Sequence, residues 1–318
     1  MAPSEHVKDD GTRMQSLIAG VSAGLVTRFV ISPLDVVKIR MQLQSIDIHA
    51  ATSPPSSATS GSTLTTIRNI LRHEGLTAFW KGNIPAEAMY ATYTGIQFIS
   101  YRTTASLLQR LVGRDNLSHT TESFLAGAVG GSSATVTTYP LDLLRTRFAM
   151  QGNARVYASL RRACVDIYRT EGLRGFFRGL APTLVQTVPQ MGIFFATFET
   201  VRQGLGSLRL PWGSDDATAG SVAGAVSKIA VFPFDLIRKR MQVQGPTRAQ
   251  YVYGNIPEYS GSVAAFRTIL AREGIRGLYR GLLISLIKST PSSTVTVWVY
   301  GRVMRGLKTF DETAEKAL

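Results

Sequence analysis

Acidic and basic residues recur three times in this chain at the same spacing. In each copy a proline is followed two residues later by an aspartate and five residues later by a lysine or arginine. The three acid–base sets are Asp35 with Lys38, Asp142 with Arg145, and Asp235 with Arg238. An acid and a base nearly one helical turn apart can form an ion pair within or between helices. One such pair on a soluble surface contributes little stability and would indicate no function.

The three sets belong to a longer phrase that repeats through the whole chain. Each copy starts at a proline, namely Pro33, Pro140 or Pro233. An acidic-Gly pair and an aromatic-basic-Gly triplet follow each time. These are Glu74-Gly75 with Trp80-Lys81-Gly82, Glu171-Gly172 with Phe177-Arg178-Gly179, and Glu273-Gly274 with Tyr279-Arg280-Gly281. Three paired copies, spaced by roughly a third of the chain, predict a protein built from three structural repeats.

This repeated phrase resembles that of the mitochondrial carrier family, and the resemblance covers nearly the whole chain. It implies an all-α membrane protein with six transmembrane helices in three pseudo-threefold repeats. Each repeat would hold two spans and a short amphipathic helix on the matrix side, around one central substrate site. We expect the repeats at residues 1–114, 115–208 and 209–318.

The distribution of charges along the chain supports six spans. Six stretches with at most one charge each approach the length of about 20 residues that crosses a bilayer as a helix. They are residues 14–34, 84–101, 121–141, 180–198, 217–234 and 282–301. They are rich in Gly, Ala, Ser and Thr, as expected where helices pack closely and one face lines water. The overall hydrophobic content of 44% also suits a soluble globular protein. The prediction of six spans therefore rests on how the charges are distributed along the chain.

The formal net charge of +14 leaves two classes open. A basic chain of this kind could be a soluble helical-repeat protein that binds nucleic acid. Its Lys and Arg residues, however, cluster after the first, third and fifth expected spans. The positive-inside rule places those loops in the matrix. We therefore expect a multi-pass protein of the mitochondrial inner membrane with both termini on the intermembrane-space side.

The resemblance assigns the three acid–base sets to a gate on the matrix side. On a threefold bundle each acid would face the base of the next repeat. The implied pairs are Asp35–Arg145, Asp142–Arg238 and Asp235–Lys38. In the family a glutamine four residues after the base braces the pair, a position that Gln42 and Gln242 occupy here. Repeat two has Ala149 instead, and we expect Asp142–Arg238 to be the pair without a brace.

A second gate, on the cytoplasmic side, is expected to be mostly missing. The family carries an aromatic-acid-x-x-base pattern on its even-numbered spans, and only Phe198-Glu199-Thr-Val-Arg202 fits it. The other repeats read Tyr101-Arg102-Thr-Thr-Ala105 and Tyr300-Gly301-Arg-Val-Met304. We expect Arg102 and Glu199 to form one remaining link, with Arg202 beside them.

Four charged residues lie in the interior of the expected spans, away from the ends, where a charge is costly and indicates a functional site. They are Arg28, Glu87, Lys228 and Lys288. Arg28 precedes Asp35 by seven residues, which places it about 10 Å above the gate by helical rise. A cation at that depth reaches the membrane surface poorly. Three such cations suit a substrate that carries several phosphate charges.

By resemblance, carriers recognise their substrates at matching points of the even-numbered spans. Those points here are Met89, Gln186 with Thr187, and Lys288. Lys288 supplies a cation, and Gln186 can both donate and accept hydrogen bonds. Met89 could contact a flat heterocycle or simply pack against its neighbours. Glu87 could bond to an aminopyrimidine, offset a thiazolium charge, or pair with a cation when the site is empty.

The loop sequences narrow the substrate. Gly82-Asn-Ile-Pro-Ala-Glu87, the residues Gln242-Val-Gln-Gly-Pro-Thr-Arg248 and the segment Tyr253-Gly-Asn-Ile-Pro257 are similar to those of family members that carry thiamine pyrophosphate. This implies import of that compound into the matrix by alternating access at one mid-membrane site. The counter-substrate would be a nucleotide or another phosphate compound. An adenine-nucleotide or coenzyme A carrier stays open, because the same cations bind any polyphosphate.

No pattern in the chain predicts an enzyme. No Gly-rich nucleotide loop precedes a helix, and His6, His49, His73 and His119 lack metal-ligand spacing. Cys164 is the one cysteine, so no intramolecular disulfide is possible. We therefore expect no catalytic residue, metal or cofactor. The resemblance further implies a monomer that contacts membrane lipid, including cardiolipin at the matrix-side helix ends, and no nucleic acid.

Overall fold

The computed structural model describes residues 13–45, 62–112, 119–153, 155–206, 215–254 and 256–317. These residues form α-helices, short 3-10 helices and loops, and this part of the chain contains no strand. The expected all-α fold is therefore confirmed for the described residues. Residues 1–12 and 46–61, which include His6 and His49, lie outside them.

Each third of the chain follows the same order of a long helix, a short helix and a second long region. The long helices are α1 (Arg13–Leu43), α3 (Asn83–Val112), α4 (His119–Ala149), α6 (Leu180–Gly206), α7 (Asp215–Gln242) and α10 (Ser289–Ala317), the last preceded by α9 (Leu282–Ile287). The short helices are α2 (Thr63–Glu74), α5 (Leu160–Gly175) and α8 (Ser262–Leu278), with 3-10 turns η1 (Leu76–Trp80) and η3 (Arg248–Gln250). Helices α1, α4 and α7 continue through their repeated prolines Pro33, Pro140 and Pro233.

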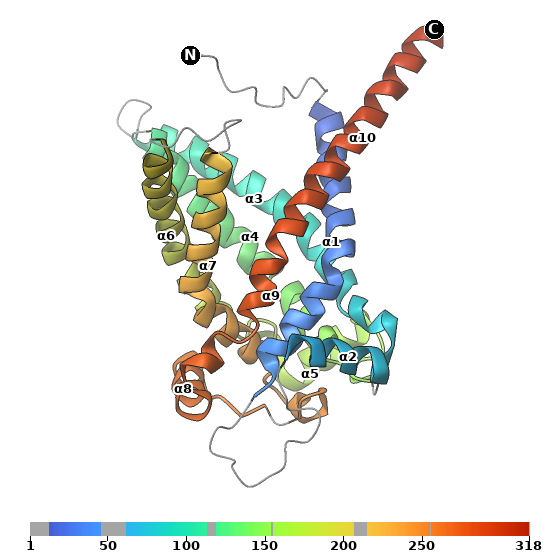
Figure 1. Cartoon of the computed structure of the whole chain (residues 1–318), viewed down its shortest axis with the longest axis vertical. Coiled ribbons are helices and arrows are strands. Elements are labelled where there is room, and N and C mark those ends of the chain that lie inside the picture. The colour runs from blue at the N-terminus through green and yellow to red at the C-terminus, as the bar shows by residue number, and fades with distance from the viewer. Residues whose placement is uncertain are drawn as a thin grey trace.

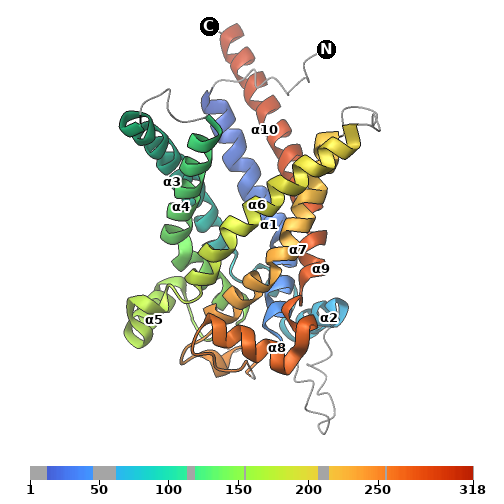
Figure 2. The same ribbon diagram turned by 90° about the vertical axis from the view of Figure 1, so that its left-hand side faces the viewer.

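The long helices converge at one end of the molecule and spread apart at the other (Figures 1 and 2). The short helices lie at the converging end, while the start of α1 and the end of α10 lie at the spread end. The long helices pack mainly between repeats, α3 against α4, α6 against α7 and α10 against α1. Because α10 returns to α1, the three repeats close into a ring.

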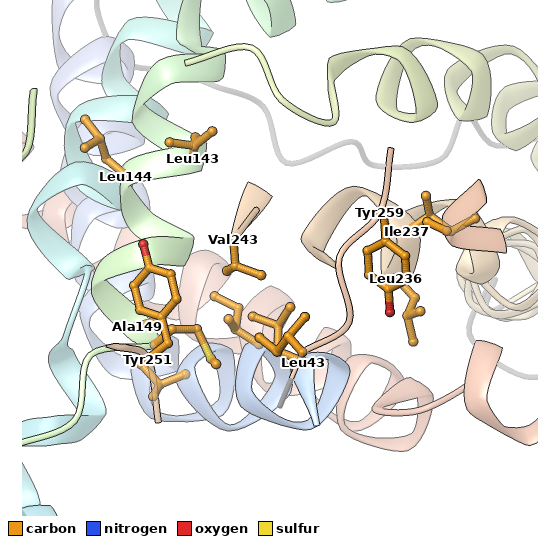
Figure 3. Packing of buried hydrophobic residues seen from close by; sticks show 14 of the residues in the cluster. Leu43, Leu143, Leu144, Ala149, Leu236, Ile237, Val243, Tyr251 and Tyr259 are labelled. Carbon is orange, nitrogen blue, oxygen red and sulfur yellow. The ribbon is translucent and has the colours of Figure 1, made fainter. Parts of the chain in front are cut away.

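The main apolar core lies at the converging end, where all three repeats contribute side chains. Figure 3 shows Leu43 of α1, Leu143 of α4 and Leu236 of α7, together with residues of the loop after α7. Tyr251 and Tyr259 of that loop are buried in the same cluster. Burying a leucine of this kind contributes about 1.5–3 kcal/mol. The converging end is therefore the most tightly packed part of the bundle.

The composition of the long helices gives less support to six spans than their length does. Within the described residues, two helical segments are both long and apolar enough to cross a membrane, Ile18–Leu43 and Asp216–Gln242. The others have sufficient length but carry polar residues, such as Thr92, Thr94 and Gln97 in α3. The six-span arrangement is therefore not confirmed by composition. A helix with one apolar face and one polar face has a lower mean hydropathy for this reason.

Candidate functional site

Three ion pairs link α1, α4 and α7 near the converging end. Arg145 Nη2 lies 2.5 Å from Asp35 Oδ2, Arg238 Nη2 lies 2.8 Å from Asp142 Oδ2, and Lys38 Nζ lies 2.7 Å from Asp235 Oδ2. Each pair joins the acid of one repeat to the base of the next, so the predicted pairings are confirmed. We call these six residues the acid–base ring. All six side chains are largely shielded from solvent, so removing one partner would leave a buried charge.

Two glutamines support the ring, as the sequence predicts. Gln42 Nε2 donates to Asp235 Oδ2 over 3.1 Å, and Gln242 Nε2 donates to Asp142 Oδ2. The expectation that Asp142–Arg238 lacks a brace is wrong. Each glutamine lies on the helix that supplies the base, so it reaches the acid of the preceding repeat. The pair without a brace is Asp35–Arg145, because α4 carries Ala149 at this position.

Lys239 is a ring contact that the sequence reasoning missed. Its Nζ donates to both oxygens of Asp142, at 3.1 and 3.0 Å, and to Gln242 Oε1 at 3.0 Å. The equivalent residues of the other repeats are Ile39 and Thr146, which cannot carry this charge. The sequence did offer a sign of this role, since the third repeat alone has a base at this position, between Arg238 and Arg240. Asp142 is therefore the most heavily bonded acid of the ring.

A second layer of ion pairs lies next to the ring, where the sequence analysis assigned no role. Three fully buried arginines each bind the glutamate of their own repeat, in the pairs Arg40–Glu74, Arg147–Glu171 and Arg240–Glu273. Each arginine also donates from Nε to a main-chain carbonyl of the next repeat, in the contacts Arg40–Ala149 (3.0 Å), Arg147–Gln242 (3.0 Å) and Arg240–Gln42 (3.1 Å). We call this set the arginine–glutamate layer. The sequence feature that could have indicated this layer is the recurrence of the arginine and the glutamate at equivalent positions of every repeat.

The first glutamate of this layer has a lowered pKa. Burial acts to raise the pKa of Glu74, but hydrogen bonds from Arg40 and Lys81 outweigh burial and keep the carboxyl ionised. Lys81 Nζ lies 2.5 Å from the Glu74 carboxylate and also donates to the carbonyls of Gln151 and Gly152, both at 2.9 Å. Lys81, which lies between η1 and α3, thereby ties repeat one to repeat two.

The glycine of the aromatic-basic-Gly triplet allows a close approach to the ring. Gly82 has a φ of +83°, and a Cβ on it would lie 2.6 Å from the carbonyl oxygen of Arg145. Gly179 has a φ of +86° and lies similarly against the carbonyl of Arg238. Both features favour glycine. The triplet therefore brings the start of the second long helix of repeats one and two, α3 and α6, against the base of the next repeat.

Lys288 and Arg28 both lie next to Asp35 of the acid–base ring. The expected span 282–301 is interrupted at Lys288, between α9 and α10. Pro291 has no amide hydrogen for the carbonyl four residues earlier, which favours a break here. Lys288 Nζ binds Asp35 Oδ1, and Arg28 Nη1 lies 4.0 Å from Asp35 Oδ2. The Arg28 guanidinium also lies 5.2 Å from the centre of the Tyr90 ring.

Glu87 does not pair with these cations, which corrects one of its expected roles. Its Oε1 accepts a hydrogen bond of 3.3 Å from Asn83, and its buried Oε2 has no partner. The buried Oε1 of Gln186 also lacks a partner. Unpaired buried oxygens are uncommon in folded proteins. Both atoms are available to accept hydrogen bonds from a ligand.

The remaining expected site residues are half-buried. Lys228 makes no hydrogen bond or ion pair with any residue of the described chain. Thr187 donates its hydroxyl to the Thr183 carbonyl over 3.0 Å, so its hydrogen is already used. The Met89 side chain makes no hydrogen bond with any other described residue. A small pocket of about 10 Å³, room for one water, adjoins Arg28 and Asp35.

The structure does not bring together the expected cytoplasmic-side residues, all of which are exposed. Arg102 lies over the Phe98 ring at 5.4 Å, and Glu199 accepts from Gln203 over 2.8 Å. Arg202 pairs with Asp216 at 3.0 Å, a partner that the sequence reasoning did not consider. The expected Arg102–Glu199 link is absent here, because these helices spread apart at this end (Figure 2).

No group of three His, Cys, Asp or Glu side chains in the described ranges could hold a metal ion. Cys164 is half-buried in α5, and burial raises the pKa of its thiol. The chemistry of these residues is therefore that of ion pairs, hydrogen bonds and unpaired polar atoms.

Comparison with known proteins gives a consistent result. A family model described as mitochondrial carrier protein matches residues 9–111, 116–208 and 212–311. Three fungal relatives match nearly full length, and each is named mitochondrial thiamine pyrophosphate carrier 1. The relative from Sclerotinia sclerotiorum is 55% identical over 98% of both chains, and that from Pyricularia oryzae is 54% identical over 97% of both. The relative from Coccidioides immitis is 51% identical over 98% of this chain and 99% of its own.

Proposed function

This chain belongs to the mitochondrial carrier family, and on that premise we propose that it transports thiamine pyrophosphate across the mitochondrial inner membrane. The observation that carries the proposal is the near full-length match, at more than half identity, to relatives named for this substrate. The protein is a transporter, in which binding and release replace catalysis. It needs no cofactor, and thiamine pyrophosphate is its cargo.

The six long helical regions cross the membrane, in repeats 1–114, 115–208 and 209–318. Large apolar side chains that are exposed on these helices support this. Examples are Phe29 on α1, Ile99 on α3, Val188 on α6 and Val297 on α10. Helices α2, α5 and α8 lie on the matrix side, and both termini lie in the intermembrane space.

The substrate site combines cations with unpaired oxygens. Arg28, Lys228 and Lys288 bind the two phosphates, since charge-assisted hydrogen bonds to phosphate are among the strongest. Glu87 and Gln186 accept hydrogen bonds from the amino group of the pyrimidine. Met89 and the region of Thr187 contact the rings. The basis is the unpaired state of Lys228, Glu87 Oε2 and Gln186 Oε1.

The acid–base ring, braced by Gln42 and Gln242, is the matrix-side gate, and the three ion pairs between α1, α4 and α7 support this role. Arg102, Glu199 and Arg202 belong to the opposite end, where pairing requires the helices to converge. Alternating access exchanges the two states around one site. The counter-substrate is a nucleotide or another phosphate compound. The carrier acts as a monomer, with cardiolipin at the matrix-side helix ends.

Uptake by reconstituted liposomes tests the substrate. Purified protein in liposomes should accumulate labelled thiamine pyrophosphate, and unlabelled thiamine pyrophosphate should compete better than adenine nucleotides or coenzyme A. Preference for a nucleotide or coenzyme A would replace the proposed substrate by the alternative. Retention in carbonate-washed membranes is the control for a membrane-spanning chain.

A further inference from the structure

We propose that Tyr90 is a positioning residue of the substrate site, which rests on Gly24 and holds the Arg28 guanidinium in place for a phosphate group of the substrate. The inference rests on the proposed function in that Arg28 binds phosphate. It adds a residue of α3 that acts on the substrate through its contact with a side chain of α1.

Arg28 carries a charge that few bonds fix in direction. Its Nη1 lies 4.0 Å from Asp35 Oδ2, well beyond the length of about 2.8 Å that is typical of a charge-assisted hydrogen bond. The guanidinium makes no hydrogen bond with any described residue, so its N–H groups remain available to a ligand. A side chain of this length loses rotamer freedom when a ligand orders it. A residue that orders the side chain beforehand removes that cost from binding.

The ring of Tyr90 is the contact that orders Arg28. The Arg28 Cζ atom lies 5.2 Å from the centre of this ring, inside the limit of about 6 Å for a cation–π interaction. The ring attracts the cation through its quadrupole and does not neutralise the positive charge. A carboxylate in the same place would compete with phosphate for the charge and for the N–H donors. Tyr90 therefore orients Arg28 and leaves both to the ligand.

Gly24 explains why the Tyr90 ring lies beside Arg28. Gly24 precedes Arg28 by four residues, so both residues lie on the same face of α1. A Cβ on Gly24 would collide with Tyr90 Cε1 and would lie 2.8 Å from Tyr90 Cζ and 2.9 Å from its hydroxyl oxygen. The ring therefore rests on the α1 backbone, in space that only a glycine leaves open. Packing between α1 and α3 fixes its place.

The other two repeats lack this arrangement of a glycine, a cation and an aromatic ring. The equivalent positions are Gly131, Thr135 and Thr187 in repeat two, and Gly224, Lys228 and Ser289 in repeat three. Repeat two has neither the cation nor the ring, and repeat three has the cation without a ring. A Cβ on Gly224 would meet no atom within 4 Å. The repeat pattern therefore does not account for Tyr90, and Gly224 offers a matched control.

The test measures the affinity of two ligands from the thermal stabilisation of the full-length protein in detergent. The ligands are thiamine pyrophosphate and inorganic pyrophosphate, which has the phosphates and no ring. Tyr90→Leu should weaken the binding of both ligands by about fivefold, the equivalent of one cation–π interaction. The Tyr90 hydroxyl has no hydrogen-bond partner among the described residues. Tyr90→Phe keeps the ring, so this variant should bind both ligands as the wild type does.

Two comparisons show whether Tyr90 acts through Arg28. In an Arg28→Met background, Tyr90→Leu should cause no further loss of affinity, because the cation that the ring orders is gone. Gly24→Ala displaces the ring and keeps Tyr90 in the chain, so it should weaken both ligands to the same extent. Gly224→Ala should leave both affinities unchanged. The unfolding temperature without ligand identifies a misfolded variant, and Gly24→Ala carries the comparison if Tyr90→Leu does not fold.

A loss in Tyr90→Leu that affects thiamine pyrophosphate alone would overturn the inference, because Tyr90 would then stack on a ring of the substrate. Unchanged affinities in Tyr90→Leu, or a loss that persists in the Arg28→Met background, would overturn it as well. If pyrophosphate stabilises the wild type and thiamine pyrophosphate does not, the proposed substrate is wrong, and the pyrophosphate affinities still decide the role of Tyr90. A wild type that neither ligand stabilises would overturn both proposals.

Discussion

Arg240 donates its Nε hydrogen to the main-chain carbonyl of Gln42 over 3.1 Å, across 198 residues of sequence. Gln42 in turn donates to Asp235, one turn before Arg240. The arginine–glutamate layer and the acid–base ring therefore meet at the same residue. Because the same contact recurs from Arg40 to Ala149 and from Arg147 to Gln242, the three repeats hold one another in a closed cycle.

The arginine–glutamate layer should contribute more stability than surface pairs. Arg147→Met leaves the buried Glu171 with only Arg178, at 2.9 Å, and should lower the free energy of unfolding by about 3 kcal/mol. Arg202→Met is the matched control. Its pair with Asp216 is 55% and 66% exposed, so it should cost less than about 1 kcal/mol. Thermal unfolding in detergent checks both, and equal losses would contradict the role of the layer.

Swapping the two charges of a ring pair should restore transport best at Asp235–Lys38, the pair with the fewest additional contacts. Asp235→Lys or Lys38→Asp alone should cripple transport, and the double swap should recover part of it, since it restores opposite charges. The same double swap at Asp142 and Arg238 should recover less, because Lys239 would then face an arginine. Uptake is measured in liposomes with verified insertion. A double swap at Asp235 and Lys38 no better than the worse single variant would contradict the pairing.

Lys228 should matter for transport and little for stability. Among the described residues it has no ion-pair partner to lose, so Lys228→Ala should unfold near the wild-type temperature while uptake falls by about tenfold or more through loss of a charge-assisted bond to phosphate. Lys228→Arg keeps the charge and should retain part of the activity. Wild-type uptake by Lys228→Ala would remove this residue from the substrate site.

Glu74 should make stability depend on pH. Its pKa is lowered in the folded protein, so the unfolded state binds the proton more tightly and the contribution of Glu74 is lost as the pH falls. Glu74→Gln should therefore be less stable than the wild type at neutral pH. That difference should shrink below the ordinary glutamate pKa of about 4.3. Thermal unfolding of both proteins across this range is the measurement, and a constant difference would refute the assignment.

Gly82 and Gly20 should respond oppositely to alanine. Gly82→Ala forces a side chain into positive φ against the Arg145 carbonyl, and should cost about 1–3 kcal/mol. Gly20→Ala meets no atom within 4 Å on α1 and should be neutral, or stabilising by up to about 1 kcal/mol. Unfolding temperatures of the two variants test this. A neutral Gly82→Ala would mean that the triplet tolerates a side chain.

The sequence by itself determined the repeats, the helical elements and the pairing partners of the ring. The reason is that Asp35, Asp142 and Asp235 recur in one register, and the resemblance to mitochondrial carriers implies a threefold bundle in which each acid faces the base of the next repeat. It also marked Arg28, Glu87, Lys228 and Lys288, because charges are rare within apolar stretches. The composition test alone would have found two spans, since polar residues dilute the others.

Only the tertiary structure decided which ion pair of the ring each neighbouring residue supports. Three side chains contact an acid on a different helix, namely Gln42, Gln242 and Lys239. Their distance from that acid therefore depends on helix packing and not on sequence spacing. The same holds for Lys288, which meets Asp35 across 253 residues because α9 starts against α1. A repeat pattern shows which positions are equivalent. The contacts between repeats show where that equivalence fails, and in this chain it fails at Asp35.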